Sequence, residues 1–292
     1  MPATTEYFGH TITNLGPLTT TFTVSPACTT ATDTVYYANA SALASFFGQP
    51  VCSTPSYGDC FPSGAVLDSI VRSEWATPGQ DAVIYFSPGL VCPSGWTTAG
   101  TLRHASAANG TSSMDASGVF TQDAWNWSSA VDAAGLPVQV IQSKILSAAE
   151  TLALCCPSGY NADADGHCYS LLGPPTLLTR YSEACYSVLP TDDVVIVSSY
   201  DGTTWTPALL SITPVVPSYS IASGELTGSA WSSLKTDVAV VTYVAAVPLI
   251  YQASDTPNAG VPRASPDLGL SIFIVVPIPV SSLAGVGLMV PL

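Results

Sequence analysis

The sequence has little charge and almost no basic residues. Of its 292 residues 9% are charged; six are Lys or Arg and twenty are Asp or Glu, so the formal net charge is −14. Ordinary soluble domains carry roughly 25% charged residues. No cluster of Lys or Arg exists to attract phosphates or anionic lipid headgroups. The composition therefore excludes a nucleic-acid partner.

Motifs of the common enzyme and cofactor classes are also missing. The chain has three histidines (His10, His104 and His167) and no Gly-x-Ser-x-Gly, phosphate-loop or dinucleotide motif. It has no Cys-x-x-Cys pair of the zinc type. We expect no cofactor. A Ser-His-Asp triad remains an alternative, because triads are defined by geometry and not by sequence order.

Neither end has a standard membrane-targeting pattern. Residues 1–18 lack the basic and apolar regions of a secretory signal. Residues 268–292 contain no charge, and this length exceeds the ~20 apolar residues that cross a bilayer. Three prolines interrupt the stretch. It predicts membrane insertion, with an altered C-terminus or a buried pair of strands as alternatives.

Cysteine is present in an even number. Because Cys/His metal spacings are absent, we predict four disulfides and an oxidising compartment, with free buried thiols in a cytosolic protein as the alternative. We expect Cys28 to pair with Cys52, and Cys168 to pair with Cys155 or Cys156. Three glycosylation sequons, at Asn39, Asn109 and Asn126, also favour export. The eight cysteines are Cys28, Cys52, Cys60, Cys92, Cys155, Cys156, Cys168 and Cys185.

Short β-prone runs and turn motifs predict a mostly β fold. The sequence Cys-Pro-Ser-Gly-aromatic occurs at 92–96 and 156–160, with a variant at 60–64, and predicts tight turns. Asp201-Gly202 predicts a hairpin. We predict a strand at 137–145 and helices at 39–47, at 63–75 and from Ser147 to the Cys155–Cys156 pair.

A repeated Gly-Pro to Cys spacing, at 16–28 and 173–185, suggests two related β units. The expected fold is a disulfide-stapled, β-sandwich-like ectodomain with a few short helices. The expected segments are an N-terminal arm (1–15), a first unit (16–172), a second unit (173–252), a Pro-rich linker (253–267) and an apolar tail (268–292).

The segment between Cys155 and Cys168 has a candidate metal loop. Asn161, Asp163 and Asp165 have the spacing of the first ligands of a calcium-binding EF-hand, and Gly166 permits the turn. Leu172 stands where the bidentate Glu should be. The alternatives are a hydrogen-bonded turn between two cysteines and a Cys/His metal site that uses His167 and Cys168.

Acidic and aromatic residues gather between residues 57 and 81, as a glycosidase with paired carboxylates would require. Helix capping and a solvated surface are the plainer interpretation. A Trp-Asn-Trp sequence at 125–127 could stack on a sugar. The acidic group consists of Asp59, Asp68, Glu74 and Asp81, with Tyr57 and Trp75 beside them.

Four stretches carry a resemblance to a known group of proteins. They are NLGPLTTTFT, YFSPGLVCPSGW, ETLALCCPSGY and IYQASD. Together they resemble uncharacterised Cys-rich surface proteins of filamentous fungi, which have an ectodomain, a linker and a C-terminal single-pass anchor. The resemblance covers about residues 7–255, and after Asp267 the apolar tail takes the place of the anchor helix that these proteins have.

The resemblance and composition together predict a fungal cell-surface or wall-associated glycoprotein that is extracellular and not an enzyme. Cell-wall glycans and surface proteins are its candidate partners. Two alternatives remain: a carbohydrate-active enzyme with an Asp/Glu pair, and an accessory protein of a fungal biosynthetic pathway.

Overall fold

A computed structural model shows a mostly β protein with several sheets. The part of the chain that it describes contains five sheets and two α-helices. The described residues are 3–26, 28, 35–50, 56–76, 82–104, 114–121, 133–173, 183–188, 194–212, 221–225, 238–255 and 289–290.

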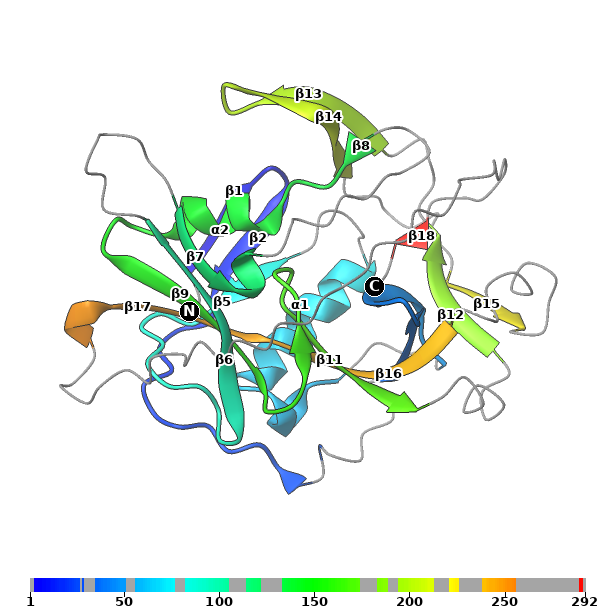
Figure 1. Ribbon diagram of the computed structural model, residues 1–292, viewed down its shortest axis with the longest axis horizontal. Coiled ribbons are helices and arrows are strands. Elements are labelled where there is room, and N and C mark those ends of the chain that lie inside the picture. The colour runs from blue at the N-terminus through cyan, green and yellow to red at the C-terminus, as the bar shows by residue number, and fades with distance from the viewer. Residues whose placement is uncertain are drawn as a thin grey trace.

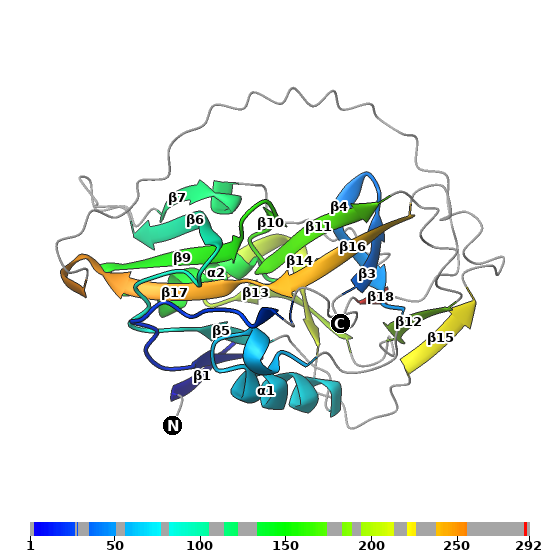
Figure 2. The ribbon, with the colours of Figure 1, turned by 90° about the horizontal axis from the view of Figure 1, so that it is seen from below.

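Two larger sheets lie next to each other (Figure 2), and the chain passes directly from a strand of one into a strand of the other. The four-stranded sheet has the order β17-β9-β6-β7, with β17 Val247–Gln252, β9 Glu150–Pro157, β6 Trp96–His104 and β7 Met114–Gly118. The five-stranded sheet has the order β10-β11-β16-β3-β4, with β10 Asn161–Ala162, β11 His167–Gly173, β16 Val238–Ala245, β3 Val35–Asn39 and β4 Ala42–Gly48.

Three connections join these two sheets: a continuous run of chain, a backbone hydrogen bond and a disulfide bond. β16 passes into β17 through the buried Ala246, so one run of chain serves both sheets. The Ala246 amide donates to the carbonyl of Gly166, in the turn between β10 and β11, at 2.8 Å. Cys156 of β9 is bonded to Cys168 of β11. The turn after β10 is therefore fixed at the place where the sheets meet.

The core follows the alternation of side chains along β9. Leu152, Leu154 and Cys156 belong to one buried cluster, which includes Leu102 of β6 and Ile250 of β17. Cys155 belongs to a second cluster, which includes Phe61, Phe86 and Leu249. Successive residues of a strand point to opposite faces, so the same strand contributes to both clusters.

Three smaller sheets complete the described part. The β13–β14 hairpin turns at Asp201-Gly202, both at positive φ (49° and 73°), which confirms the predicted hairpin. It lies at the top in Figure 1. The sheets are β1 (Ala3–Tyr7), β2 (His10–Asn14) and β5 (Val83–Tyr85); β15 (Ile221–Glu225), β12 (Glu183–Val188) and β18 (Met289–Val290); and β13 (Val194–Tyr200), β14 (Thr203–Ile212) and β8 (Ala133–Ala134).

The two helices confirm one prediction and correct another. α1 (Gly64–Ala76) forms where a helix was predicted and packs Leu67 and Val71 against Phe61 and Phe86. α2 (Val138–Ile145) replaces the predicted strand at 137–145. In α2 the apolar residues that pack against the core, buried Ile141 and partly buried Val138 and Ile145, are spaced at helical intervals of three and four residues.

The other two predicted helices are wrong. Residues 39–47 form the β3–β4 hairpin, where the Asn39 side chain accepts a hydrogen bond from the Ser41 amide. At Ser147 the Glu150 carboxylate does reach back to the Ser147 amide, at 2.8 Å, but the chain continues into β9. Local side-chain bonds of this kind form turns as readily as helix ends, and the pairing of β9 with its neighbours decides the outcome.

The large sheets combine strands from both sides of residue 173, because β11 pairs with β16, and β16 pairs with β3. The two related units remain a prediction. Most of the linker and tail, 256–288, lies outside the described residues; Met289–Val290 pairs with β12. Among the described residues, no helix has the length and hydrophobicity to cross a bilayer.

Candidate functional site

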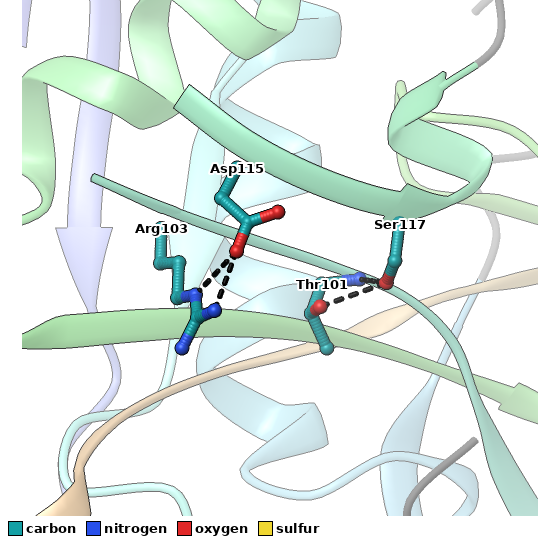
Figure 3. A network of polar contacts seen from close by, with 4 residues as sticks. All are labelled: Thr101, Arg103, Asp115 and Ser117. Carbon is teal, nitrogen blue, oxygen red and sulfur yellow. Dashed lines mark hydrogen bonds and ion pairs between the residues drawn. The ribbon is translucent and has the colours of Figure 1, made fainter. Parts of the chain in front are cut away.

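A ladder of polar side chains crosses β6 and β7 on one face of the four-stranded sheet (Figure 3). Arg103 donates from Nε and Nη2 to one oxygen of Asp115, at 2.8 and 2.5 Å. Two residues along, the Thr101 amide donates to Ser117 Oγ at 3.1 Å, and the two hydroxyls lie 2.8 Å apart. The Arg103 and Asp115 side chains are 60% and 50% exposed, so this ladder faces solvent.

The same face continues across the other two strands. Arg103 lies opposite Thr151 of β9, and Thr151 lies opposite Tyr251 of β17. Burial raises the pKa of Tyr251, and the Arg103 charge opposes that rise. We call the four residues Asp115, Arg103, Thr151 and Tyr251 the polar row. It presents, side by side, a carboxylate, a guanidinium, a hydroxyl and a half-buried phenol ring.

The reverse face of these strands is apolar. Each of three polar-row residues has an apolar neighbour in the chain, whose side chain points to the opposite face. These neighbours are Leu102, Leu152 and Ile250, and each is at most 2% exposed. The polar row is therefore held on a strand framework whose other side is packed into the core. Sequence reasoning missed it, although the alternation in Thr101-Leu-Arg103 and Asp115-Ala-Ser117 is a signal that could have found it.

The predicted calcium loop is a tight hairpin turn between β10 and β11. Asp163 is 8% exposed, and its carboxylate accepts from the His167 amide at 3.0 Å and lies 2.9 Å from His167 Nδ1. The Asp163 amide donates to the His167 carbonyl at 3.1 Å. Asp165 is exposed at the tip, and Asn161 lies exposed opposite Tyr169. The turn is thus built by hydrogen bonds around Asp163.

The seven cysteines that the structure describes form disulfides, as predicted. The bonds are Cys28–Cys60, Cys92–Cys155 and Cys156–Cys168, and Cys185 is also disulfide-bonded. The expected pairing of Cys28 with Cys52 is wrong, and Cys52 itself lies outside the described residues. The alternative metal site of His167 and Cys168 is also wrong, because the Cys168 sulfur is in a disulfide and is not available as a thiolate ligand. These disulfides indicate an extracellular or secreted protein.

The acidic group between residues 57 and 81 supports backbone structure. Buried Asp68 accepts from Ser56 Oγ at 3.2 Å and from the amides of Tyr57 at 2.6 Å and Gly58 at 3.2 Å. Glu74 accepts from the Ala82 amide. Asp81 and the side chain of Trp75 lie outside the described part.

A depression of about 490 Å³ lies near the start of α1 and is lined by Phe22 and Phe61. Asp59 is its only acidic lining residue among those that the structure describes. A glycosidase needs two carboxylates that face one another. The described residues of this depression do not provide such a pair.

The three histidines are not brought together. His10 is in β2, His104 ends β6 and His167 begins β11, so they belong to three different sheets. His104 Nε2 lies 3.0 Å from the Leu146 carbonyl. The histidines therefore do not form a shared centre.

A second exposed ion pair joins α2 to the β13–β14 turn. Lys144 Nζ donates to Asp201 at 2.5 Å, and the Tyr7 hydroxyl donates to the same oxygen at 3.1 Å. These bonds hold the pKa of Asp201 below its ordinary value, with the Lys144 bond as the larger cause. The pKa of Lys144 is raised for the same reason.

Of the predicted glycosylation sites, only Asn39 is described; it lies at the β3–β4 turn beside exposed Ala40 and Ser41. Asn109, Asn126 and the Trp-Asn-Trp sequence lie outside the described residues. No protein-family model, curated protein or solved structure matches this chain.

Proposed function

We propose that the chain is a non-enzymatic surface or wall-associated protein of a filamentous fungus, which binds cell-wall glycans through the polar row. The observation that carries this proposal is the line of exposed Asp115 and Arg103 with partly buried Thr151 and Tyr251 across four paired strands. Sugars present hydroxyls and flat C–H faces, so a binding surface needs charged hydrogen-bonding groups next to an aromatic ring.

The groups of the polar row match these needs. Arg103 uses Nε and Nη2 on Asp115, and the guanidinium has five N–H donors, so further donors remain for sugar hydroxyls. The Tyr251 ring is half-buried and so is held in place at little cost in side-chain entropy. The adjacent Thr101–Ser117 pair adds hydroxyls on the same face.

The state of the acidic residues supports a binding role over catalysis. Asp68 and Glu74, two of the four acids considered for a glycosidase pair, accept hydrogen bonds from backbone amides. The net charge of −14 supports neutral glycans over polyanionic ones as ligands.

The test is retention on insoluble polysaccharide. The purified protein is incubated with chitin and with β-1,3-glucan, and the bound fraction is compared with that in a tube without polysaccharide and in one with cellulose. We expect binding to at least one wall polymer, and about tenfold weaker binding after Arg103→Ala or Tyr251→Ala, as for a central contact residue.

Lys144→Ala is the matched control, because Lys144 also forms an exposed ion pair but on α2. Its binding should equal that of the wild type. No retention on any wall polymer, or equal retention of all four proteins, would refute the proposal.

A further inference from the structure

We infer that Asp163, Asp165 and His167 form a binding site for one divalent transition-metal ion such as Zn²⁺. One ligand atom from each residue lies within 4.8 Å of the other two. Ligands of an ion with bonds of about 2.0–2.2 Å are roughly 3–4 Å apart, so small side-chain movements bring all three atoms onto one ion. This inference does not depend on the proposed glycan-binding function.

The hairpin places the side chains on one face. The β10–β11 register pairs Asn161 with Tyr169 and Ala162 with Cys168, and the next pair is Asp163 with His167. Since side chains alternate, Asp163 and His167 share a face with Asn161 and Tyr169, while Cys168 points into the core.

The turn is rigid before any ion binds. The Cys156–Cys168 disulfide closes its base, and the Gly166 carbonyl accepts from the Ala246 amide at the sheet junction. Two hydrogen bonds that do not involve the His167 ring, from the His167 amide to the Asp163 carboxylate and from the Asp163 amide to the His167 carbonyl, hold the backbone of these two residues in place. A rigid set of donors loses little entropy when it binds an ion.

A second observation comes from α2. The side chain of Gln142 is 5% exposed, and its Nε2 lies 3.4 Å from the carbonyl of Ala164, between the two aspartates. Its Oε1 is buried and has no hydrogen-bond partner among the described residues. Buried acceptors are satisfied in almost all native structures, so this oxygen calls for a water beside the turn, and such a water would be available to complete the coordination of an ion.

The ligand set decides the class of ion. Ca²⁺ and Mg²⁺ prefer all-oxygen sites, whereas imidazole favours Zn²⁺, Cu²⁺ and related ions. The structure adds His167 to the two aspartates, and this replaces the calcium expected from Asn161, Asp163 and Asp165 with a transition metal. On binding, the Nδ1 proton that now faces the Asp163 carboxylate would be released to solvent or replaced by the Nε2–H tautomer, so that Nδ1 and the Asp163 oxygen both become ligands; water would complete the coordination.

The test uses the full chain with its disulfides intact and without a histidine tag. Zn²⁺, Co²⁺ and Ca²⁺ are titrated separately by calorimetry, and the Co²⁺ complex is followed by its visible absorption. We expect one Zn²⁺ per chain, weaker Ca²⁺ binding, and a Tm higher by about 5 °C when Zn²⁺ exceeds Kd a hundredfold.

His167→Gln and Asp165→Asn should each weaken Zn²⁺ binding at least ~10-fold and change the Co²⁺ spectrum. Asp165→Asn keeps the Asp163–His167 bonds, so it tests the site even if His167→Gln loosens the hairpin. His104→Gln, a change of the same type at another partly exposed histidine, should bind Zn²⁺ like the wild type.

Three results would overturn the inference. They are the absence of stoichiometric Zn²⁺ binding, equal Zn²⁺ affinity in the wild type and Asp165→Asn, and Ca²⁺ binding tighter than Zn²⁺ binding.

Discussion

Cys155 and Cys156 are adjacent in β9, yet their disulfides lie on opposite faces of the sheet. Cys155 bonds to Cys92 in the cluster around Phe61 and Phe86, and Cys156 bonds to Cys168 in the cluster around Leu152 and Leu154. Because alternate side chains of a strand point in opposite directions, neighbouring cysteines can join two different layers to one strand. β9 is thereby fixed on both sides.

The two disulfides of β9 should differ in their effect on stability. Cys92–Cys155 closes 63 residues and Cys156–Cys168 closes 12. The chain-entropy model gives about 4 kcal/mol for the longer loop and about 3 kcal/mol for the shorter one. We expect the Cys92→Ala/Cys155→Ala variant to unfold at a lower urea concentration than Cys156→Ala/Cys168→Ala. Equal midpoints would contradict this, and mass spectrometry of non-reduced peptides checks the remaining bonds.

Removal of the Asp68 carboxylate should destabilise the start of α1. Asp68→Ala leaves the amides of Tyr57 and Gly58 without their acceptor, which costs about 2–3 kcal/mol in unfolding free energy. Asp59→Ala, at an exposed neighbouring acid, should change it by less than about 0.5 kcal/mol. Chemical denaturation of both variants makes the comparison; equal losses would show that Asp68 has no special structural role.

The Lys144–Asp201 pair should make stability depend on pH at both extremes. The pKa of Asp201 lies below its ordinary 3.8, so its contribution is complete above that pH and is lost as the pH falls through the folded-state value. The pKa of Lys144 lies above its ordinary 10.5, so its contribution is complete below that pH and is lost as the pH rises through the folded-state value.

The measurement is the difference in unfolding free energy between the wild type and Asp201→Asn. It should be constant from about pH 5 to pH 9, shrink in stronger acid, and become smaller in 1 M salt, because both side chains are exposed. Asn tolerates the positive φ of this turn position, so the variant removes the charge without straining the turn. A difference that does not respond to pH or salt would argue against the ion pair.

Two glycines at positive φ should respond differently to alanine. At Gly202 a Cβ would meet nothing within 4 Å, so Gly202→Ala costs about 1 kcal/mol of backbone strain. At Gly118 a Cβ would lie 2.0 Å from the Ala99 carbonyl oxygen, so Gly118→Ala adds a clash that costs about 1–3 kcal/mol more. Thermal unfolding of the two variants would test the order, and a smaller loss at Gly118 would contradict it.

Several turns and helix α1 could be predicted from the sequence, because they depend on interactions between residues close together in the chain. Asp201-Gly202 gives a two-residue turn because both positions need positive φ. The repeats at 92–96 and 156–160 form turns in which Gly95 and Gly159 have φ of 78° and 84°. Helix α1 follows from its apolar spacing. These features depend on neighbours within a few residues.

Elements that depend on distant partners were misread. Residues 150–157 followed a helix-start signal, but pairing with β6 and β17 makes them a strand. Val138 and Val140 suggested alternation, yet packing against two clusters favours a helix. Cys28 was expected to pair with the nearest downstream cysteine, but the fold brings Cys60 to it. The polar row was missed because its members come from four strands.

The sequence by itself determined the mostly β class, the oxidised cysteines and the tight turns, since these follow from composition and from bonds between near neighbours. Tertiary structure alone decided which cysteines pair, which acids support the backbone, and that Arg103 meets Asp115 while His167 joins Asp163 and Asp165. Strand register sets these contacts, and it depends on how distant segments bury their apolar faces together.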